Sequence, residues 1–163
     1  MKLLYYTLFF GMLAFVTTAT AQKVVVYDKY DSMEKALIKD NSTIYIINFW
    51  ATWCAPCIKE LPYFEKLHIE NKQVKLILVS LDSKKDLESK LIPFLKKKNI
   101  TSEVVLLSDK DYNTWLTKVD ENWSGAIPAT WIVRGNQKVF TEREFENFTA
   151  LNDYVNSFIN LNK

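Results

Sequence analysis

Cys54 and Cys57 are the only two cysteines in this chain of 163 residues, so any sulfur chemistry must use this pair. Ala55 and Pro56 separate them, a spacing that lets two thiols close a small disulfide ring. At the start of a helix, unpaired backbone N–H groups and the positive end of the helix dipole favour a thiolate over a thiol. Because a thiolate is the species that attacks another disulfide, the spacing predicts thiol–disulfide exchange.

The residues on either side of the pair predict the elements that would position it. Residues 44–50 form an apolar run, which is typical of a buried parallel strand. Apolar residues at three-residue steps then predict a helix over residues 55–71. Pro56 fits the first turn of that helix, where a missing N–H costs nothing, and Pro62 would bend the helix axis. A Cys-x-x-Cys pair between a strand and a helix is the setting in which the motif indicates redox chemistry.

A metal site and a structural bridge are the other uses of such a pair. Zinc normally takes three or four protein ligands, whereas the chain offers two cysteines and one histidine, His68. His68 lies about three helical turns from the cysteines, so the residues disfavour a metal. A disulfide across so short a loop would constrain the unfolded chain only weakly. Redox cycling therefore explains the spacing better, and a structural bridge stays open as the alternative.

Two stretches of the chain resemble the thioredoxin superfamily. Residues 48–57 read Asn-Phe-Trp-Ala-Thr-Trp-Cys-Ala-Pro-Cys, which is similar to the active-site segment of that superfamily. The continuation over residues 57–62, Cys-Ile-Lys-Glu-Leu-Pro, resembles exported, membrane-associated thiol-disulfide oxidoreductases of the TlpA and ResA type. Residues 125–133, Gly-Ala-Ile-Pro-Ala-Thr-Trp-Ile-Val, resemble the loop in which a proline with a cis peptide bond faces the disulfide. The resemblance implies a thioredoxin-like fold over residues 23–163.

The order of the cysteines and the resemblance together assign roles at the expected site. Cys54, at the more exposed start of the helix, would attack the substrate, and the more buried Cys57 would resolve the mixed disulfide. Glu60 lies three residues after Cys57, hence on the same helical face, and the resemblance places a functional glutamate there. Partial burial would raise the pKa of Glu60 and let it accept the proton of Cys57; a solvent-exposed glutamate is the alternative. Asn48 stands where thioredoxin carries a buried aspartate, so that aspartate's role cannot be assigned to it.

Five residues are expected to contact the substrate: Trp53, Pro56, Trp123, Ile127 and Pro128. The resemblance implies a cis bond before Pro128, which would hold the backbone of Ile127 so that it pairs with an extended substrate segment. Trp53 and Trp123 would form an apolar surface beside the sulfurs. For Trp123, a place in the core is an equal alternative.

The first 21 residues predict a signal peptide. A positive start at Lys2, an apolar core over residues 3–16 and small residues at Ala19 and Ala21 match a secretory leader. Cleavage would leave a thioredoxin-like domain over residues 22–163. An uncleaved membrane anchor is the competing interpretation, but an apolar core of about fourteen residues is short for a span, which needs about twenty. We therefore expect an exported protein, periplasmic or otherwise extracytoplasmic.

Strand and helix patterns alternate along the rest of the chain and predict one α/β domain. The expected strands and hairpin span residues 24–27, 74–81, 104–107 and 130–141. Helices are expected to start at Asp31 and to span residues 84–99, 111–119 and 148–159. The helix and strand before the proline loop resemble an insertion of the exported branch. We expect a thioredoxin-like α/β fold, with a central mixed β-sheet, helices on both faces and this inserted helix-strand element before the cis-proline loop.

The composition of the chain limits the kinds of binding partner that we expect. A net charge of +2 and 48% hydrophobic residues are ordinary for a globular domain. Three consecutive lysines at residues 96–98 fit the solvated end of a predicted helix, so no nucleic-acid partner is expected. No cofactor and no metal is expected either. The resemblance implies protein disulfide substrates, such as components of cytochrome c maturation, and a membrane thiol carrier as electron donor, which would make the protein a reductant. The two residues between the cysteines do not fix the redox direction, so an oxidant stays open as the alternative.

Two functions of other classes compete with this interpretation. A thiol peroxidase on the same fold would need the pattern Pro-x-x-x-Thr-x-x-Cys. Residues 47–54 read Ile-Asn-Phe-Trp-Ala-Thr-Trp-Cys, so the proline is missing and the threonine is one position too close. A non-catalytic binding module, whose disulfide stays closed, is harder to exclude from the residues.

Overall fold

The computed structural model describes residues 23–161, so the expected signal peptide, residues 1–21, lies outside the described residues. The sheet contains six strands: β1 (Val25–Tyr27), β2 (Ile44–Trp50), β3 (Val74–Ser80), β4 (Glu103–Leu107), β5 (Ala129–Arg134) and β6 (Gln137–Thr141). The strand order is β1-β4-β3-β2-β5-β6. Strands β1, β4, β3 and β2 run parallel to one another, whereas β5 and β6 pair antiparallel to their neighbours. The sheet is therefore mixed, as predicted.

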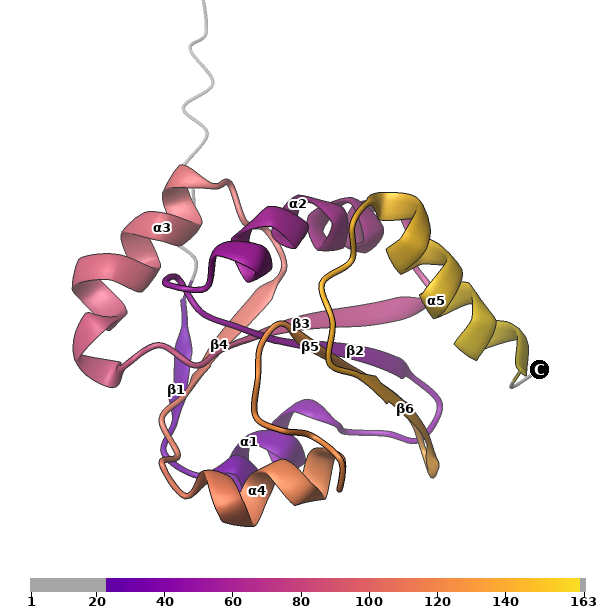
Figure 1. The fold of residues 1–163 in the computed structure, drawn as a ribbon, viewed down its shortest axis with the longest axis horizontal. Helices are drawn as coiled ribbons and strands as arrows, with labels where there is room; N and C mark the ends of the chain where they lie inside the picture. Colours follow the sequence, from indigo (N-terminus) through magenta and orange to yellow (C-terminus); the bar gives the residue numbers. More distant parts are fainter. Residues whose placement is uncertain (1–22, 162–163) are drawn as a thin grey trace, which may run out of the picture.

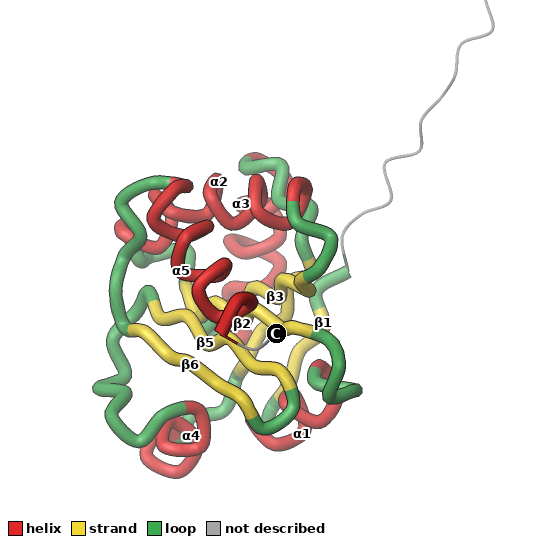
Figure 2. Tube along the Cα trace, turned by 90° about the vertical axis from the view of Figure 1, so that its right-hand side faces the viewer, coloured by secondary structure: helices red, strands yellow, loops and turns green. Residues whose placement is uncertain are grey.

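Helices cover both faces of the sheet, which also confirms the prediction (Figure 1). They are α1 (Tyr30–Leu37), α2 (Ala55–Glu70), α3 (Ile92–Lys97), α4 (Tyr112–Val119) and α5 (Phe148–Leu161). Figure 2 shows the same layers from the side, with α2, α3 and α5 above the sheet and α1 and α4 below it. The helix α3 and strand β4 form the expected insertion before the proline loop.

Burial on both faces explains the continuous apolar run that predicted β2. Alternate side chains of a strand point to opposite faces, so a strand covered on both sides is apolar at nearly all positions, and Asn48 is the polar residue in β2. Toward α2, α3 and α5, the strand contributes Ile44, Ile46 and Trp50 to the core. Toward α1 and α4, it contributes Tyr45, Ile47 and Phe49. This central strand ends directly before the two cysteines.

Two prolines lie within predicted helices, and the two helices differ in how they accommodate them. The segment predicted as one helix over residues 84–99 begins with a 3₁₀ turn (Lys84–Asp86) and a π-helical turn (Leu87–Leu91), and only then continues as α3. Pro93 has no N–H to give to the preceding turn, and a wider turn accommodates that loss. Pro62, by contrast, lies inside α2, which runs on to Glu70.

The first helix starts differently from the expectation. Lys29, not Asp31, is the N-cap residue of α1, and Asp31 lies in the first turn, where a negative charge is favourable. Within residues 23–161, no helix combines the length and the apolar character that crossing a bilayer requires.

Candidate active site

The two cysteines form a disulfide at the N-terminus of α2. Their Sγ atoms are 1.99 Å apart and their Cα atoms 5.3 Å apart. Cys54 is the N-cap residue, and its Sγ accepts a hydrogen bond from the N–H of Cys57 at 3.3 Å. Pro56 lies in the first turn, where no N–H is needed. Cys54 is 5% exposed and Cys57 is fully buried, so Cys54 is the less enclosed of the two residues.

The loop before β5 faces the disulfide. Its Ile127–Pro128 peptide bond is cis, as the resemblance implied. The carbonyl oxygen of Ile127 lies 3.6 Å from Sγ of Cys54. Gly125 has a φ of +90°, and a Cβ atom there would lie 3.2 Å from a side-chain carbon of Leu116, so the path of this loop favours glycine. The structure thus brings together two stretches that lie about seventy residues apart in the sequence.

Glu60 lies on α2 one turn after Cys57 and is fully buried. One carboxylate oxygen accepts a hydrogen bond from Nδ2 of Asn48 at 3.1 Å, and the other accepts one from the N–H of Phe145 at 2.9 Å. Burial raises the pKa of Glu60 to about 7, and the two hydrogen bonds oppose the rise. The alternative of a solvent-exposed glutamate is therefore wrong, and proton transfer with Cys57 stays a prediction.

Asn48 connects Glu60 to the sheet. Its Nδ2 also donates to Oγ1 of Thr130 on β5 at 3.2 Å, and both side chains are fully buried. Because an amide neither gains nor loses a proton near neutral pH, Asn48 orients the carboxyl of Glu60 and does not carry the proton itself.

The two tryptophans that were expected to receive substrates have different environments. Trp53, directly before Cys54, is 68% exposed and forms an apolar surface beside it. Trp123 is 6% exposed and packs against Phe49 and Phe140, with ring centroids 4.7 and 5.3 Å apart. Its indole N–H donates to the carbonyl oxygen of Ala126 at 2.9 Å. Trp123 therefore occupies the core, which was one of the two alternatives that the sequence left open. Its hydrogen bond to Ala126 also supports the proline loop.

Asp82, which no sequence motif singled out, holds the turn before Cys54. Its buried carboxylate accepts hydrogen bonds from the N–H of Thr52 at 3.0 Å and from the hydroxyl of Thr52 at 2.6 Å. The hydroxyl of Ser80 donates a third, at 2.8 Å. An acidic residue directly after an apolar strand, at the same edge of the sheet as the cysteines, was the available signal.

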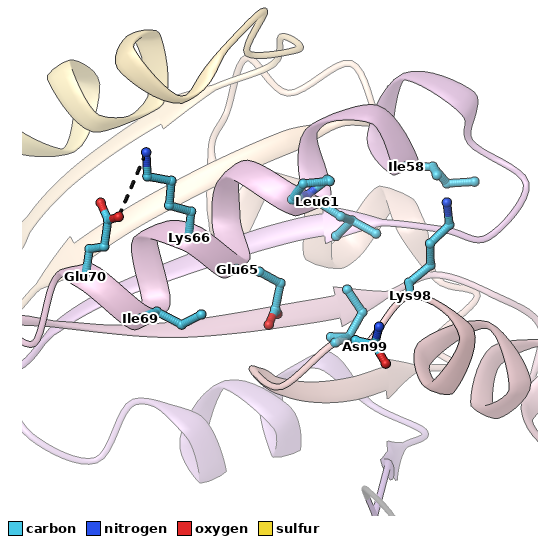
Figure 3. Close-up of a pocket in the computed structure, with 10 residues that line it drawn as sticks. Ile58, Leu61, Glu65, Lys66, Ile69, Glu70, Lys98 and Asn99 are labelled. Atoms are coloured by element: carbon cyan, nitrogen blue, oxygen red, sulfur yellow. Dashed lines mark ion pairs between the residues drawn. The ribbon is translucent and has the colours of Figure 1, made fainter.

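A cavity of about 360 Å³ runs along the outer side of α2 (Figure 3). Ile58 and Lys98 lie at one end, and Ile69 and the ion pair of Lys66 with Glu70 lie at the other. Neither cysteine lines this cavity, so we assign the site to the sulfurs and the proline loop. In the part of the chain that the structure describes, no three His, Cys, Asp or Glu side chains are grouped as metal ligands.

The fold and the site together define a thioredoxin-like protein. A solved structure of a thioredoxin-related protein from Neisseria meningitidis serogroup B has a TM-score of 0.62 and 24% identity, covering 76% of this chain and 90% of that one. A secreted thiol-disulfide isomerase from Corynebacterium glutamicum has a TM-score of 0.59 and 16% identity, covering 74% and 72%. At these identities the likeness shows the fold. A model of the AhpC/TSA family matches residues 18–141, and the chain belongs to that family.

Curated relatives match part of the chain. The thiol-disulfide oxidoreductase ResA of Bacillus cereus is 31% identical over 94 residues, which cover 57% of this chain and 50% of the relative. The sporulation thiol-disulfide oxidoreductase A of Bacillus subtilis is 35% identical over 63 residues, covering 37% of this chain and 38% of the relative. The chain thus matches half or less of the length of these relatives.

Proposed function

We propose that this protein is an extracytoplasmic thiol-disulfide oxidoreductase that reduces disulfides of protein substrates. One observation carries the proposal: a disulfide at a helix N-terminus, with Cys54 less enclosed than Cys57, faces a cis-proline loop. The names of the curated relatives support the same activity. A purely structural bridge would not need its less enclosed cysteine beside an exposed tryptophan.

The proposed reaction starts from the dithiol form. The thiolate of Cys54 attacks one sulfur of a substrate disulfide, that S–S bond breaks, and the other substrate sulfur leaves as a thiolate and takes a proton. Glu60 accepts the proton of Cys57, whose thiolate then attacks Sγ of Cys54. The second substrate sulfur leaves as a thiol. The substrate has gained two electrons and two protons, and the protein is left as the Cys54–Cys57 disulfide, which a thiol donor must reduce.

Substrate docking uses the surface around Cys54. An extended substrate segment pairs with the backbone of Ile127 next to Pro128, in the manner of strand addition. The exposed rings of Trp53 and Pro56 flank Cys54 and cover the apolar part of the segment. Docking of this kind accepts many protein disulfides, since backbone pairing reads little of the side-chain sequence.

The proposed location and partners follow from the leader and the relatives. Residues 1–21 match a secretory leader, and a solved structure of the same fold belongs to a secreted protein. Outside the cytoplasm, electrons would have to come from a membrane thiol carrier, and components of cytochrome c maturation are the proposed substrates.

Reduction of insulin by dithiothreitol tests the activity. The protein from residue 22 onward should accelerate the reaction, a Cys54→Ser variant should not, and a Cys57→Ser variant should accumulate a mixed disulfide through Cys54. No acceleration by the unsubstituted protein would indicate a binding module, and equal acceleration by Cys54→Ser would remove Cys54 from the mechanism. Consumption of peroxide in place of insulin reduction would indicate a peroxidase.

The direction of the reaction needs a separate measurement. Equilibration of the Cys54/Cys57 couple with glutathione gives its reduction potential. A potential well below that of glutathione supports the reductant, because the dithiol then passes electrons on readily. A potential far above it would make the protein an oxidant.

A further inference from the structure

The segment between β6 and α5, residues 142–146, contacts both halves of the site; we call it the strap. In Figure 1 it is the segment that rises from β6 to α5. On the side of α2, the N–H of Phe145 donates to Glu60, as described above. In the strap, Glu144 forms an ion pair with Lys59 at 2.6 Å. The carbonyl oxygen of Glu146 accepts a hydrogen bond from the hydroxyl of Tyr63 at 3.2 Å.

On the other side, Glu142 binds the proline loop. One carboxylate oxygen accepts a hydrogen bond from the N–H of Ser124 at 3.0 Å. The other accepts one from the N–H of Ala126 at 3.2 Å and one from the hydroxyl of Ser124. A single carboxylate therefore takes three donors from one short loop, two of them backbone N–H groups, and such charge-assisted hydrogen bonds are stronger than neutral ones.

The loop depends on these contacts because little else packs around it. Ser124, Gly125 and Ala126 are all exposed, and the side chains described above that reach them are Leu116, beside Gly125, and Trp123. Between the buried Trp123 and the buried Pro128, the other hydrogen bonds are one from Trp123 to the carbonyl oxygen of Ala126 and one from the N–H of Ala126 to the hydroxyl of Ser124. The next residue, Ile127, carries the carbonyl group that lies beside Cys54.

We propose that Glu142 is a positioning residue that holds residues 124–127 in the conformation that a protein substrate pairs with. This inference rests on the proposed function. Glu142 contacts neither sulfur, so it acts through the loop. Its removal should weaken the binding of substrates that pair with Ile127 and should leave the reaction of Cys54 with small disulfides unchanged.

A comparison of two substrates tests the proposal. With Glu142→Ala, we expect the KM for insulin to rise about three- to tenfold, the range for losing hydrogen bonds to a partly exposed charge. The rate with hydroxyethyl disulfide, which has no segment to pair, should stay within about twofold. Glu142→Gln keeps one acceptor oxygen and should have a smaller effect. Glu146→Ala is the matched control, because it removes an exposed carboxylate from the same strap.

Three results would overturn the proposal: an unchanged KM for insulin, equal losses with both substrates, or the same loss in Glu146→Ala. Ser124→Ala provides a second route if Glu142→Ala does not fold, because it removes the hydroxyl donor and keeps the carboxylate. Ser124→Ala should also raise the KM for insulin, but by less than Glu142→Ala.

Amide hydrogen exchange separates this proposal from the proposed function. Exchange at Ser124 and Ala126 should be at least about tenfold faster in Glu142→Ala than in the unsubstituted protein or in Glu146→Ala. This measurement needs no turnover. If the unsubstituted protein fails to reduce insulin, the proposed function falls, and the exchange rates still decide whether Glu142 holds the loop; equal rates would reject that role.

Discussion

Two glutamates beside the disulfide have environments suited to different tasks. Glu60 is fully buried and shares its two hydrogen bonds between a side-chain amide and one backbone N–H. Burial puts its pKa near the working pH, which suits a group that takes up and releases a proton. Glu142 is half-buried and accepts hydrogen bonds from an exposed loop, which suits a group that holds the backbone of that loop in place.

The raised pKa of Glu60 predicts how stability changes with pH. Its pKa in the folded protein is about 7, above the ordinary value of 4.5. Between these values the folded protein keeps a proton that the unfolded chain has released, so the free energy of unfolding falls as pH rises. This contribution is fully present below pH 4.5 and is lost as pH rises through about 7, a change of about 3 kcal/mol.

Urea unfolding of the protein and of Glu60→Gln, at pH 4.5 and at pH 8, measures this change. The free energy of unfolding of the unsubstituted protein, relative to that of Glu60→Gln, should be lower at pH 8 than at pH 4.5. Glu121→Gln, at an exposed position, serves as the control and should show no such shift. A difference that is independent of pH would mean that Glu60 does not titrate in this window.

Exposure at Trp53 predicts a variant that loses binding without losing stability. Because the side chain is 68% exposed, Trp53→Ala should change the free energy of unfolding by no more than about 0.5 kcal/mol. The kcat/KM for insulin should fall about fivefold or more, as is usual for an aromatic side chain at the centre of a contact. Tyr112→Ala, at an exposed aromatic on α4, should leave kcat/KM unchanged. Equal effects of the two variants would contradict a role for Trp53 in docking.

At the scale of elements, a side chain that follows β3 holds the turn between β2 and α2. Asp82, directly after β3, binds the backbone and the hydroxyl of Thr52. Two parallel neighbours therefore position the disulfide together: β2 delivers the cysteines, and the end of β3 holds the chain that leads to them.

Removal of that carboxylate should destabilise the protein. Asp82→Ala removes a buried carboxylate and leaves the N–H and hydroxyl of the half-buried Thr52 without their partner, so we expect a loss of about 1–3 kcal/mol in the free energy of unfolding. Ser83→Ala, one residue further along and exposed, should stay within about 0.5 kcal/mol. Urea unfolding measures both. A loss below 0.5 kcal/mol for Asp82→Ala would show that water replaces the carboxylate.

The elements that sequence analysis predicted well are those with a strong local signal. Strands β2 and β3 are continuous apolar runs, and the disulfide pair and Glu60 lie within one short motif. The π-helical turn before α3 was not predicted, because a proline reveals that a helix is disturbed but not which turn absorbs the missing hydrogen bond.

Asp82 and Glu142 were missed for a different reason. Their partners lie 30 and 18 residues away in the chain, so no spacing rule connects them. Each is also one of 19 acidic residues, and no sequence pattern distinguishes these two from the others. Trp123 had two equal interpretations for the same reason, because only packing decides between core and surface.

At the scale of the whole molecule, the leader and the folded domain predict one mature product. The first strand of the domain, β1, begins at Val25, three residues after Gln22, where the mature chain is expected to start. When the full chain is expressed with export in a bacterial host, the intact mass should correspond to a chain that starts at Gln22. A product that retains Met1 would instead favour an uncleaved membrane anchor.

The strand order has a consequence for association between copies of the protein. Apolar runs such as those in β2 and β3 would template intermolecular strand pairing if they lay at an open border of the sheet. Here they are interior strands, and the borders are β1, which has three residues, and β6, which carries Lys138. Short and charged borders discourage edge-to-edge growth. In the folded state the apolar runs of β2 and β3 are therefore not available for pairing with another copy, and aggregation through them should require unfolding first.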